Sequence, residues 1–413
     1  MIAADSVPAS ARIAGKVIRD YEDLEQLGPA WAGLFSRAAC DNVFLSIDWI
    51  DEWWRRYGKG QALFVIALQD GAGQLIGVAP FCIGPALGRH WGIRSLKFLG
   101  SQWVSSDHLD LLVEPGFARP AAREVGRMIR DHRREWDYIE LSDCDEGSPT
   151  MAELRNTLDR HGWKQRVMSR GTCPYIPLPE SFQTYLAGLN SNWRRNFRHG
   201  LRTLQKAARV QFSVLEDASA IGGRFAEAMR LHQARLEERG SDSTFLDEAQ
   251  QAFHSAVQDR VAPRGWVRLF LLEADGKAIA AYYGFSVRGR FLALQSGFDP
   301  AWSRYSVGLV MVGLAIEESI RSGHKEFDFL RGNERYKFHW TGYVREAVTI
   351  RYFNDTPAGS MMFLVSWMSV KWAAARRALR RWIEGRPALS QLARRIPAWR
   401  NTFSLEKPHG SIS

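Results

Sequence analysis

The sequence predicts an α+β protein with two tandem lobes, each a mixed sheet flanked by helices, followed by a C-terminal amphipathic helix. Its 413 residues exceed what one compact core usually holds. Each half of the chain repeats the same order of elements: a hairpin of apolar strands, a further strand, a helix and a closing strand. A composition of 46% hydrophobic and 24% charged residues is typical of a globular chain.

The elements of the first half begin with two apolar strands around a tight turn at Asp70 and Gly71. Further apolar runs and one helical pattern follow in order. The expected elements are strands at 63–68, 75–83, 94–100 and 108–113, a helix at 117–132, and a strand at 135–143.

The second half repeats this order around a turn at Asp275 and Gly276. It is expected to form strands at 267–273, 278–287, 290–298 and 324–332, with a helix at 304–320. Helical patterns at 182–189, 190–210 and 221–258 lie between the halves. We therefore divide the chain into a flexible N-terminus (1–20), a first lobe (21–180), a second lobe (181–355) and a basic tail (356–413).

The net charge of +10 is concentrated in two segments. Residues 190–210 hold six Arg or Lys and no acid, and residues 371–400 hold nine against one acid. The remainder of the chain is mildly acidic. This distribution indicates local anionic partners rather than a uniformly basic nucleic-acid binder, although the stripe at 190–210 is equally compatible with a solvated helix face.

The cysteines and histidines give no metal-binding pattern. The four cysteines are far apart without a C-x-x-C pair, and the ten histidines form no H-x-x-x-H or H-E-x-x-H arrangement, so we expect no metal and a reducing compartment. The N-terminus lacks the apolar core of a secretory signal, and no stretch reaches about 18 apolar residues. We expect a cytoplasmic protein.

A candidate anion site lies where the strand at 290–298 leads into the apolar helix. The stretch from Ser303 to Gly308, which contains the small residues Ser303, Ser306 and Gly308, opens this helix. The unpaired N–H groups of a helix N-terminus, together with the helix dipole, can hold a pyrophosphate, and glycine allows close approach. An ordinary cap by Ser303 or Ser306 fits the same spacing.

A second polar cluster follows the strand expected at 324–332. Asp328, Tyr336, Lys337 and His339 lie within twelve residues, at the C-terminal end of a strand, where sites tend to form in α/β proteins. A carboxylate, a phenol, an amine and an imidazole supply acid, base and anion-binding groups. A capped turn with surface charges fits the same residues.

Four stretches carry a family resemblance: Ser191-Asn192-Trp193-Arg194-Arg195-Asn196, Leu231-His232-Gln233-Ala234-Arg235, Ser306-Val307-Gly308, and Phe327-Asp328-Phe329-Leu330-Arg331-Gly332 running into Tyr336-Lys337. The span from about 185 to 353 resembles the GNAT-like domain of the CelD (cellulose-biosynthesis-associated) acetyltransferase family, which is related to FemAB-type aminoacyl transferases. Because FemAB-type proteins pair two GNAT-like halves, the repeated lobes extend the likeness to residues 20–353.

The resemblance implies an acyltransferase that moves an acyl group from acetyl-CoA or a longer acyl-CoA to an amine or hydroxyl acceptor. Polysaccharide or envelope biosynthesis would be its setting. The implied donor-binding residues are Arg304, Tyr305, Ser306, Val307, Gly308 and Lys337, with Lys337 facing donor phosphate.

The implied reaction centre contains Asp328 and Tyr336. We expect Asp328 or His232 to act as the base and Tyr336 to protonate the leaving group. The residues assigned to the acceptor side are Asp107, His108, Arg194 and Arg195.

Two other functions are compatible with the resemblance. One is a FemAB-like aminoacyl transferase that uses charged tRNA, with residues 190–210 contacting phosphates. The other is a non-catalytic membrane-peripheral scaffold. We favour acyl-CoA over tRNA, because six cations on one helix make a short track for a large polyanion.

The C-terminal tail combines an apolar run at 361–370 with the arginine-rich sequence that follows it. This pattern predicts a helix too short in its apolar part to span a bilayer but suited to an anionic membrane surface. A helix docked on the second lobe with a solvated arginine face is the alternative.

Overall fold

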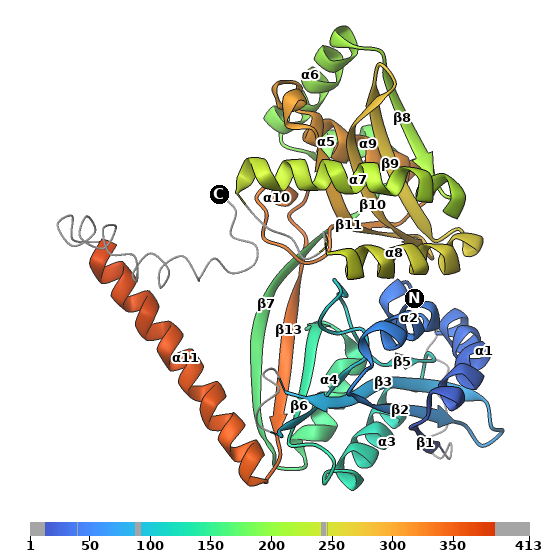
Figure 1. Cartoon of the computed structure of the whole chain (residues 1–413), viewed down its shortest axis with the longest axis vertical. Coiled ribbons are helices and arrows are strands. Elements are labelled where there is room, and N and C mark those ends of the chain that lie inside the picture. The colour runs from blue at the N-terminus through green and yellow to red at the C-terminus, as the bar shows by residue number, and fades with distance from the viewer. Residues whose placement is uncertain (1–12, 39, 87–91, 241–244, 246, 385–413) are drawn as a thin grey trace.

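The structure is a computed structural model that describes residues 13–38, 40–86, 92–240, 245 and 247–384, apart from the side chains of residues 239, 370, 373–377 and 379–384. In this part of the chain two lobes of mixed α and β structure are joined by two long strands, β7 (Lys164–Pro177) and β13 (Val344–Phe353) (Figure 1). Helices flank a large mixed sheet, which confirms the predicted α+β class.

The strands of the first lobe are short apolar runs that the fold buries almost completely. The expected strand at 108–113 is reduced to its last two residues, because the chain before it turns through a left-handed His108 with φ of 54°. The elements are β1 (Ala14–Ile18), α1 (Tyr21–Arg37), α2 (Ile47–Tyr57), β2 (Ala62–Gln69), β3 (Leu75–Pro85), β4 (Arg94–Phe98), β5 (Leu112–Val113), α3 (Ala118–Asp131), β6 (Tyr138–Asp145) and α4 (Pro149–Asp159).

The second lobe follows the same order after two short connecting helices. The strand expected at 324–332 is shorter, because the chain leaves the sheet before a left-handed Leu330. The elements are α5 (Phe182–Gly188), α6 (Ser191–Ala207), β8 (Val210–Leu215), α7 (Ala218–Arg239), α8 (Glu248–Val261), β9 (Val267–Ala274), β10 (Lys277–Val287), β11 (Arg290–Phe298), α9 (Val307–Arg321), β12 (Glu326–Asp328) and α10 (Lys337–Trp340).

The pairing of the strands repeats between the lobes. In the first lobe β2 pairs antiparallel with β3, β3 antiparallel with β4, and β4 parallel with β6. In the second lobe β9, β10, β11 and β12 pair in the same three ways. A parallel pair needs a crossover, and α3 and α9 provide it in the two lobes. The tandem repeat predicted from the order of elements is confirmed.

The closing strands of the two halves are exchanged. β7 ends the first half of the sequence but pairs with β12, whereas β13 ends the second half but pairs with β6. β7 and β13 also pair with each other, so the described strands form one path: β1-β2-β3-β4-β6-β13-β7-β12-β11-β10-β9-β8. As a result of this exchange, β13 completes the sheet of the first lobe. The boundaries of the four predicted segments remain predictions.

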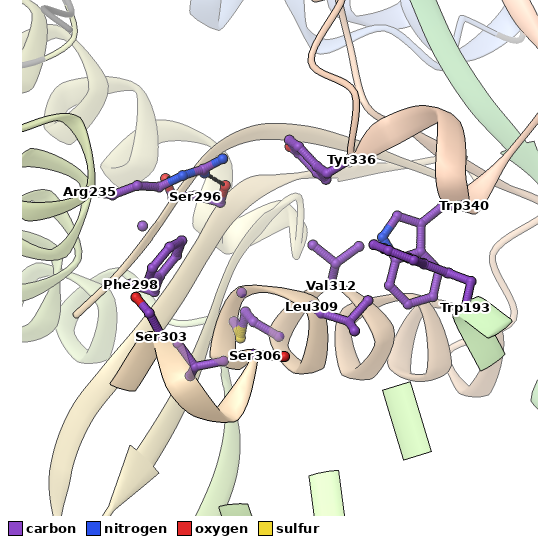
Figure 2. Close-up of a pocket in the computed structure, with 14 residues that line it drawn as sticks. Trp193, Arg235, Ser296, Phe298, Ser303, Ser306, Leu309, Val312, Tyr336 and Trp340 are labelled. Carbon is purple, nitrogen blue, oxygen red and sulfur yellow. Dashed lines mark hydrogen bonds between the residues drawn. The ribbon is translucent and has the colours of Figure 1, made fainter. Parts of the chain in front are cut away.

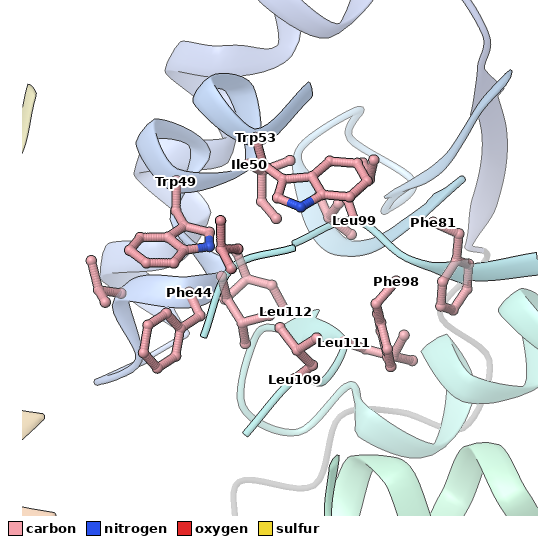
Figure 3. Close-up of a cluster of buried hydrophobic side chains, with 14 of the residues drawn as sticks. Phe44, Trp49, Ile50, Trp53, Phe81, Phe98, Leu99, Leu109, Leu111 and Leu112 are labelled. Atoms are coloured by element: carbon pink, nitrogen blue, oxygen red, sulfur yellow. The ribbon is translucent and has the colours of Figure 1, made fainter. Parts of the chain in front are cut away.

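The core of the first lobe fixes the loop that reaches toward the second. Trp49 and Trp53 on α2 are fully buried, close to Phe44 and Phe98 (Figure 3). The Trp49 indole N–H donates to Ser106 Oγ at 2.9 Å, which satisfies the polar edge of a buried ring. The loop after β4 is thereby held at a defined place between the lobes.

The C-terminal helix α11 (Pro357–Glu384) packs on the protein only near its start. Phe363 lies 5.4 Å from the Phe353 ring on β13, and Lys164 on β7 lies over the ring of Phe363. Arg166 on β7 bonds Ser366 one turn later, and beyond this second contact the helix extends away from both lobes (Figure 1). Within the described residues, no helix combines the length and apolar character needed to cross a membrane.

Candidate active site

The first candidate cavity lies where two parallel strands of the second lobe diverge. β11 pairs with β12 only from Arg290 to Leu292 and then continues to Phe298 paired with β10 alone. A cavity of about 230 Å³ occupies the space between the end of β11 and the first turns of α9 (Figure 2). Its lining is Trp193, Arg235, Ser296, Gly297, Phe298, Ser303, Ser306, Val307, Gly308, Leu309, Met311, Val312, Tyr336 and Trp340.

The opening turn of α9 presents backbone to this cavity. Ser306 adopts a left-handed conformation with φ of 54°, and its side chain makes no capping hydrogen bond. The first N–H groups of a helix have no partner within it and carry the positive end of the dipole. A side chain at Gly308 would place its Cβ 3.1 Å from the Phe298 ring, so glycine keeps the helix close to β11.

Three of the predicted donor residues line this cavity: Ser306, Val307 and Gly308. Arg304 and Tyr305 lie just before them in a 3₁₀ turn (Pro300–Tyr305), where the Arg304 guanidinium lies 4.7 Å from the centre of the Tyr305 ring. These two residues flank the cavity without lining it.

Two tryptophans of the cavity carry N–H groups without acceptors. The Nε1 atoms of Trp193 and Trp340 are buried and make no hydrogen bond. Trp193 on α6 stacks on His339 at 4.2 Å between ring centres, which fixes its plane. Two unpaired donors in a mostly apolar cavity favour a ligand that carries hydrogen-bond acceptors.

A second cavity of about 180 Å³ adjoins the first and shares Arg235, Ser296 and Tyr336 with it. Its other lining residues come from both lobes: Ser105 and Asp107 from the first, and His232, Leu236, Tyr282, Ala293, Leu294, Gln295, Phe329, Leu330, Arg331, Glu334 and Lys337 from the second. The two cavities thus lie next to each other, the first at the α9 N-terminus and the second at the interface between the lobes.

His232 faces the second cavity with a defined tautomer. Its Nδ1 lies 3.0 Å from the Ser296 carbonyl oxygen, which can only accept, so Nδ1 carries the proton. The buried Nε2 has no hydrogen-bond partner. Burial lowers the pKa of His232, and the imidazole is therefore neutral with a free lone pair on Nε2.

The position of His232 depends on Gly297. A Cβ atom at Gly297 would collide with the backbone of Leu231 and His232. Only glycine lets α7 pack this closely on β11, and this contact brings the imidazole to the Ser296 carbonyl.

Tyr336 lies between the two cavities (Figure 2). The Arg235 guanidinium lies 5.5 Å from the centre of its ring and donates to Ser296 Oγ at 2.8 Å. Burial, together with the adjacent Tyr336, raises the pKa of Tyr282, so the Tyr282 hydroxyl keeps its proton at neutral pH. Tyr336 therefore has a cation on one side and a neutral phenol on another.

Lys337 lies in the second cavity and not among the residues that line the first. Its Nζ is 3.0 Å from Glu334 Oε2 and donates to the carbonyl oxygens of Leu330 and Arg331 at 3.3 Å. Burial alone would lower the pKa of Lys337, but Glu334 raises it. The ammonium is thus charged and held by the loop after β12, away from the α9 N-terminus.

Asp328 is fully buried between the lobes and lines neither cavity. Its Oδ2 lies 3.0 Å from His108 Nε2 and 2.5 Å from Arg290 Nη2, and its Oδ1 accepts from the Leu330 N–H. Burial alone would raise the pKa of Asp328, but His108 and Arg290 outweigh it and hold the pKa well below the ordinary value. A carboxylate so stabilised is a weak base.

Asp107 and His108 both reach the interface between the lobes. The Asn42 side-chain amide donates to both of their carbonyl oxygens and anchors the loop. Asp107 Oδ2 accepts from the Arg331 N–H at 3.0 Å, whereas its buried Oδ1 makes no hydrogen bond and lies 3.6 Å from Arg331 Nε. Asp107 therefore lines the second cavity, while His108 fixes Asp328.

Arg194 and Arg195 line neither cavity. Arg194 donates to the carbonyl oxygens of Leu186 and Ala187 at 3.0 Å, where it caps the end of α5. Arg195 is exposed and bonds Asn192 one turn earlier. The structure thus separates these two residues from Asp107.

Sequence reasoning did not assign roles to several lining residues with polar groups, among them Trp193, Arg235, Glu334 and Trp340. Each lies within or next to a stretch that carried the family resemblance. The spacing of Arg235 one turn after His232 was the available signal, because residues three apart share a helix face. Among the described residues, no cluster of three or more His, Cys, Asp or Glu could hold a metal ion.

Residues 191–338 match the family model of the acetyltransferase (GNAT) domain. The second lobe is therefore similar to a GNAT domain over these residues. The match runs from α6 into α10 and includes the diverging strands, the α9 N-terminus and the cavity residues of this lobe other than Trp340. Comparison with curated proteins finds no match to the chain.

The fold of the whole chain is similar to that of two solved structures. FemX aligns with a TM-score of 0.57 at 11% identity, over 80% of this chain and 97% of FemX. The C-terminal domain (DUF2156) of a protein described as a lysylphosphatidylglycerol synthetase, from Agrobacterium fabrum, aligns with a TM-score of 0.50 at 9% identity, over 83% of this chain and 94% of that domain. At such identities the likeness is one of fold.

Proposed function

We propose that this chain transfers an acyl group from acyl-CoA to a primary amine. The observation that carries the proposal is the pair of adjoining cavities with opposite hydrogen-bonding needs. The first holds unpaired N–H donors, from Trp193 and Trp340, and the second holds unpaired acceptors. A thioester donor and an amine acceptor would meet where Tyr336 separates the two.

The lining of the first cavity fits an acyl-CoA. The α9 N-terminus suits a pyrophosphate, the apolar wall from Leu309 to Val312 suits an alkyl arm, and the two indole N–H groups suit its amide carbonyls. The α9 turn and Gly308 supply the phosphate contacts in this proposal, because Lys337 is engaged elsewhere.

The lining of the second cavity favours an amine over a hydroxyl acceptor. His232 Nε2 is a buried acceptor without a donor, and Asp107 Oδ1 and Glu334 Oε2, although ion-paired with Arg331 and Lys337, lack a well-oriented hydrogen bond. A protonated primary amine brings three N–H donors, whereas a hydroxyl brings one. Leaving buried acceptors unpaired costs about 1–3 kcal/mol each, so the donor-rich group is the better ligand.

His232 and Tyr336 can perform the two proton transfers. A bound thioester supplies an activated carbonyl and a thiolate leaving group. His232 Nε2 accepts a proton from the ammonium, and the Tyr336 hydroxyl donates one toward the departing sulfur and is reprotonated from the amine nitrogen. The N–C bond forms as the C–S bond breaks, and the products are an amide, a thiol and the proton on His232. We propose a positioning role for Asp328.

Activity is expected to fall only at acidic pH. The base must be neutral, and burial lowers the pKa of His232, so protonation removes activity only as the pH falls through a value below the ordinary histidine value of about 6.5. A pH profile of kcat/KM with acetyl-CoA and an amino-sugar or lysine-peptide acceptor measures this limb. An acid limb centred well above that value would assign the base to another group.

Replacing Gly308 with glutamate is expected to abolish acyl-CoA binding. The new side chain meets the Phe298 ring and places a negative charge at the α9 N-terminus, where the phosphates are proposed to bind. Calorimetry of intact protein and variant with acetyl-CoA and longer acyl-CoAs measures the loss. Gly308→Gln has nearly the same bulk without the charge and separates the steric from the electrostatic part.

An aminoacyl-tRNA donor is the second candidate. It is favoured by exposed Arg198, Arg202 and Lys206 on α6, which packs beside the turn that leads into α9, and by the likeness of fold to FemX. The same calorimetry with bulk aminoacyl-tRNA decides between them. Salt-sensitive tRNA binding without any response to acyl-CoA would replace the first proposal, and no response to either donor would favour a non-catalytic scaffold. As part of the first proposal, we propose that the chain belongs to the CelD family and acts in polysaccharide or envelope biosynthesis.

A further inference from the structure

Helix α11 carries an exposed apolar surface that neither lobe covers. Leu364, Val365, Trp367 and Met368 are between 45% and 56% exposed, and Trp372 is 65% exposed. A side chain of this kind is usually buried, and large apolar patches on a protein surface mark interaction sites. We call these five residues the α11 apolar face.

The α11 apolar face points away from the protein. The opposite side of the helix is held by Arg166, which bonds the carbonyl and hydroxyl oxygens of Ser366, and by Phe363 against Phe353. With about 100° per residue, the five exposed positions fill a continuous arc centred opposite Ser366.

Positive charge accompanies this face. The Lys371 ammonium lies 5.3 Å from the centre of the Trp367 ring, so a cation lies beside the exposed aromatic residue. From 371 to 384 the sequence of α11 has five Arg or Lys and one acid. An exposed apolar arc with Trp and Leu, followed by a sequence rich in cations, is typical of a helix that lies in a membrane interface.

We propose that α11 docks this chain on an anionic membrane surface, with its apolar face in the headgroup region and its cations against acidic lipids. Charge decides between the possible occupants. Two copies of α11 would bring two strongly cationic segments together, whereas an anionic bilayer complements both the charge and the apolar arc. The proposal is independent of the transferase proposal, because it uses none of the residues of the two cavities.

Vesicle co-sedimentation tests the docking. We expect the intact chain to pellet with vesicles of phosphatidylcholine containing about 30% phosphatidylglycerol, not with phosphatidylcholine alone, and to be released by about 1 M salt. Met368→Glu lies at the centre of the arc, and the adjacent Ser369→Glu adds the same charge outside it. We expect Met368→Glu to bind vesicles about tenfold more weakly than Ser369→Glu. Only Met368→Glu removes an apolar side chain that the docked helix would bury in the headgroup region.

Several results would overturn the proposal. One is that the intact chain does not bind anionic vesicles at low salt. Another is that both variants lose binding equally, which would mean that binding depends on charge and not on an apolar contact. Elution of the intact chain as a dimer that Met368→Glu converts to a monomer would instead assign the face to a second copy. Thermal unfolding of both variants at the temperature of the intact chain shows that the fold is retained.

Discussion

Replacing His232 with glutamine is expected to lower kcat about 10²–10⁴-fold, the usual contribution of a positioned general base. Glutamine can keep a donor toward the Ser296 carbonyl but offers no group that accepts a proton at neutral pH. The KM for acyl-CoA is expected to change little, because His232 does not line the first cavity. Thiol release from acetyl-CoA with a lysine-peptide acceptor measures both constants.

The matched control for this substitution is His199→Gln on α6, where the imidazole is exposed and lines neither cavity. We expect it to leave kcat unchanged. The acid limb of the pH profile should also disappear in His232→Gln and persist in His199→Gln. Turnover of His232→Gln at the rate of the intact protein would exclude His232 as the base.

Replacing Asp328 with asparagine is expected to destabilise the fold by about 1–3 kcal/mol at neutral pH, the cost of removing a buried acceptor from charged donors. The cost is no larger because Arg290 keeps its ion pairs with Glu326 at 2.8 Å and Asp41 at 3.1 Å. Arg290, itself buried, loses the carboxylate oxygen at 2.5 Å, and His108 loses its partner across the lobes. Urea unfolding at neutral pH measures the change. Because the folded-state pKa of Asp328 is depressed, its contribution is present above the unfolded value of about 3.9 and is lost as the pH falls toward the folded value.

Asp23→Asn provides the comparison for this variant. Asp23 pairs with Lys16 at 3.3 Å, but the side chains are 39% and 70% exposed, so the same chemical change should cost less than about 1 kcal/mol. If Asp328→Asn unfolds at the same urea concentration as the intact protein but has lost turnover, Asp328 takes part in the reaction and the positioning role proposed for it is wrong.

The sequence identified the features that depend on neighbouring residues. Apolar runs around Asp70 and Asp275 gave the two hairpins, and Ser306, Val307 and Gly308 gave the helix opening at the first cavity, because turns and helix N-termini are set by a few consecutive side chains. It also gave the repeat of the lobes, since each hairpin is followed by the same elements in the same order.

The environment of each candidate side chain could not be predicted from the sequence. Asp328 and His108 are 220 positions apart, yet their contact makes Asp328 part of an ion pair between the lobes. Lys337 forms a local ion pair with Glu334, but its burial, with only 4% of the residue exposed, is a result of packing in the folded chain. Ionisation depends on burial and on neighbouring charges, and both arise from contacts between distant segments.

The sequence by itself determined the α+β class, the repeated order of elements and the turn that opens α9, because periodicity, turn residues and helix caps act over short distances. Only the tertiary structure decided that β7 and β13 exchange places between the lobes. It also decided that His232 lines a cavity with an unpaired Nε2, and that the apolar face of α11 is exposed. Strand exchange and burial are fixed by packing between segments far apart in the chain, which no local pattern of residues encodes.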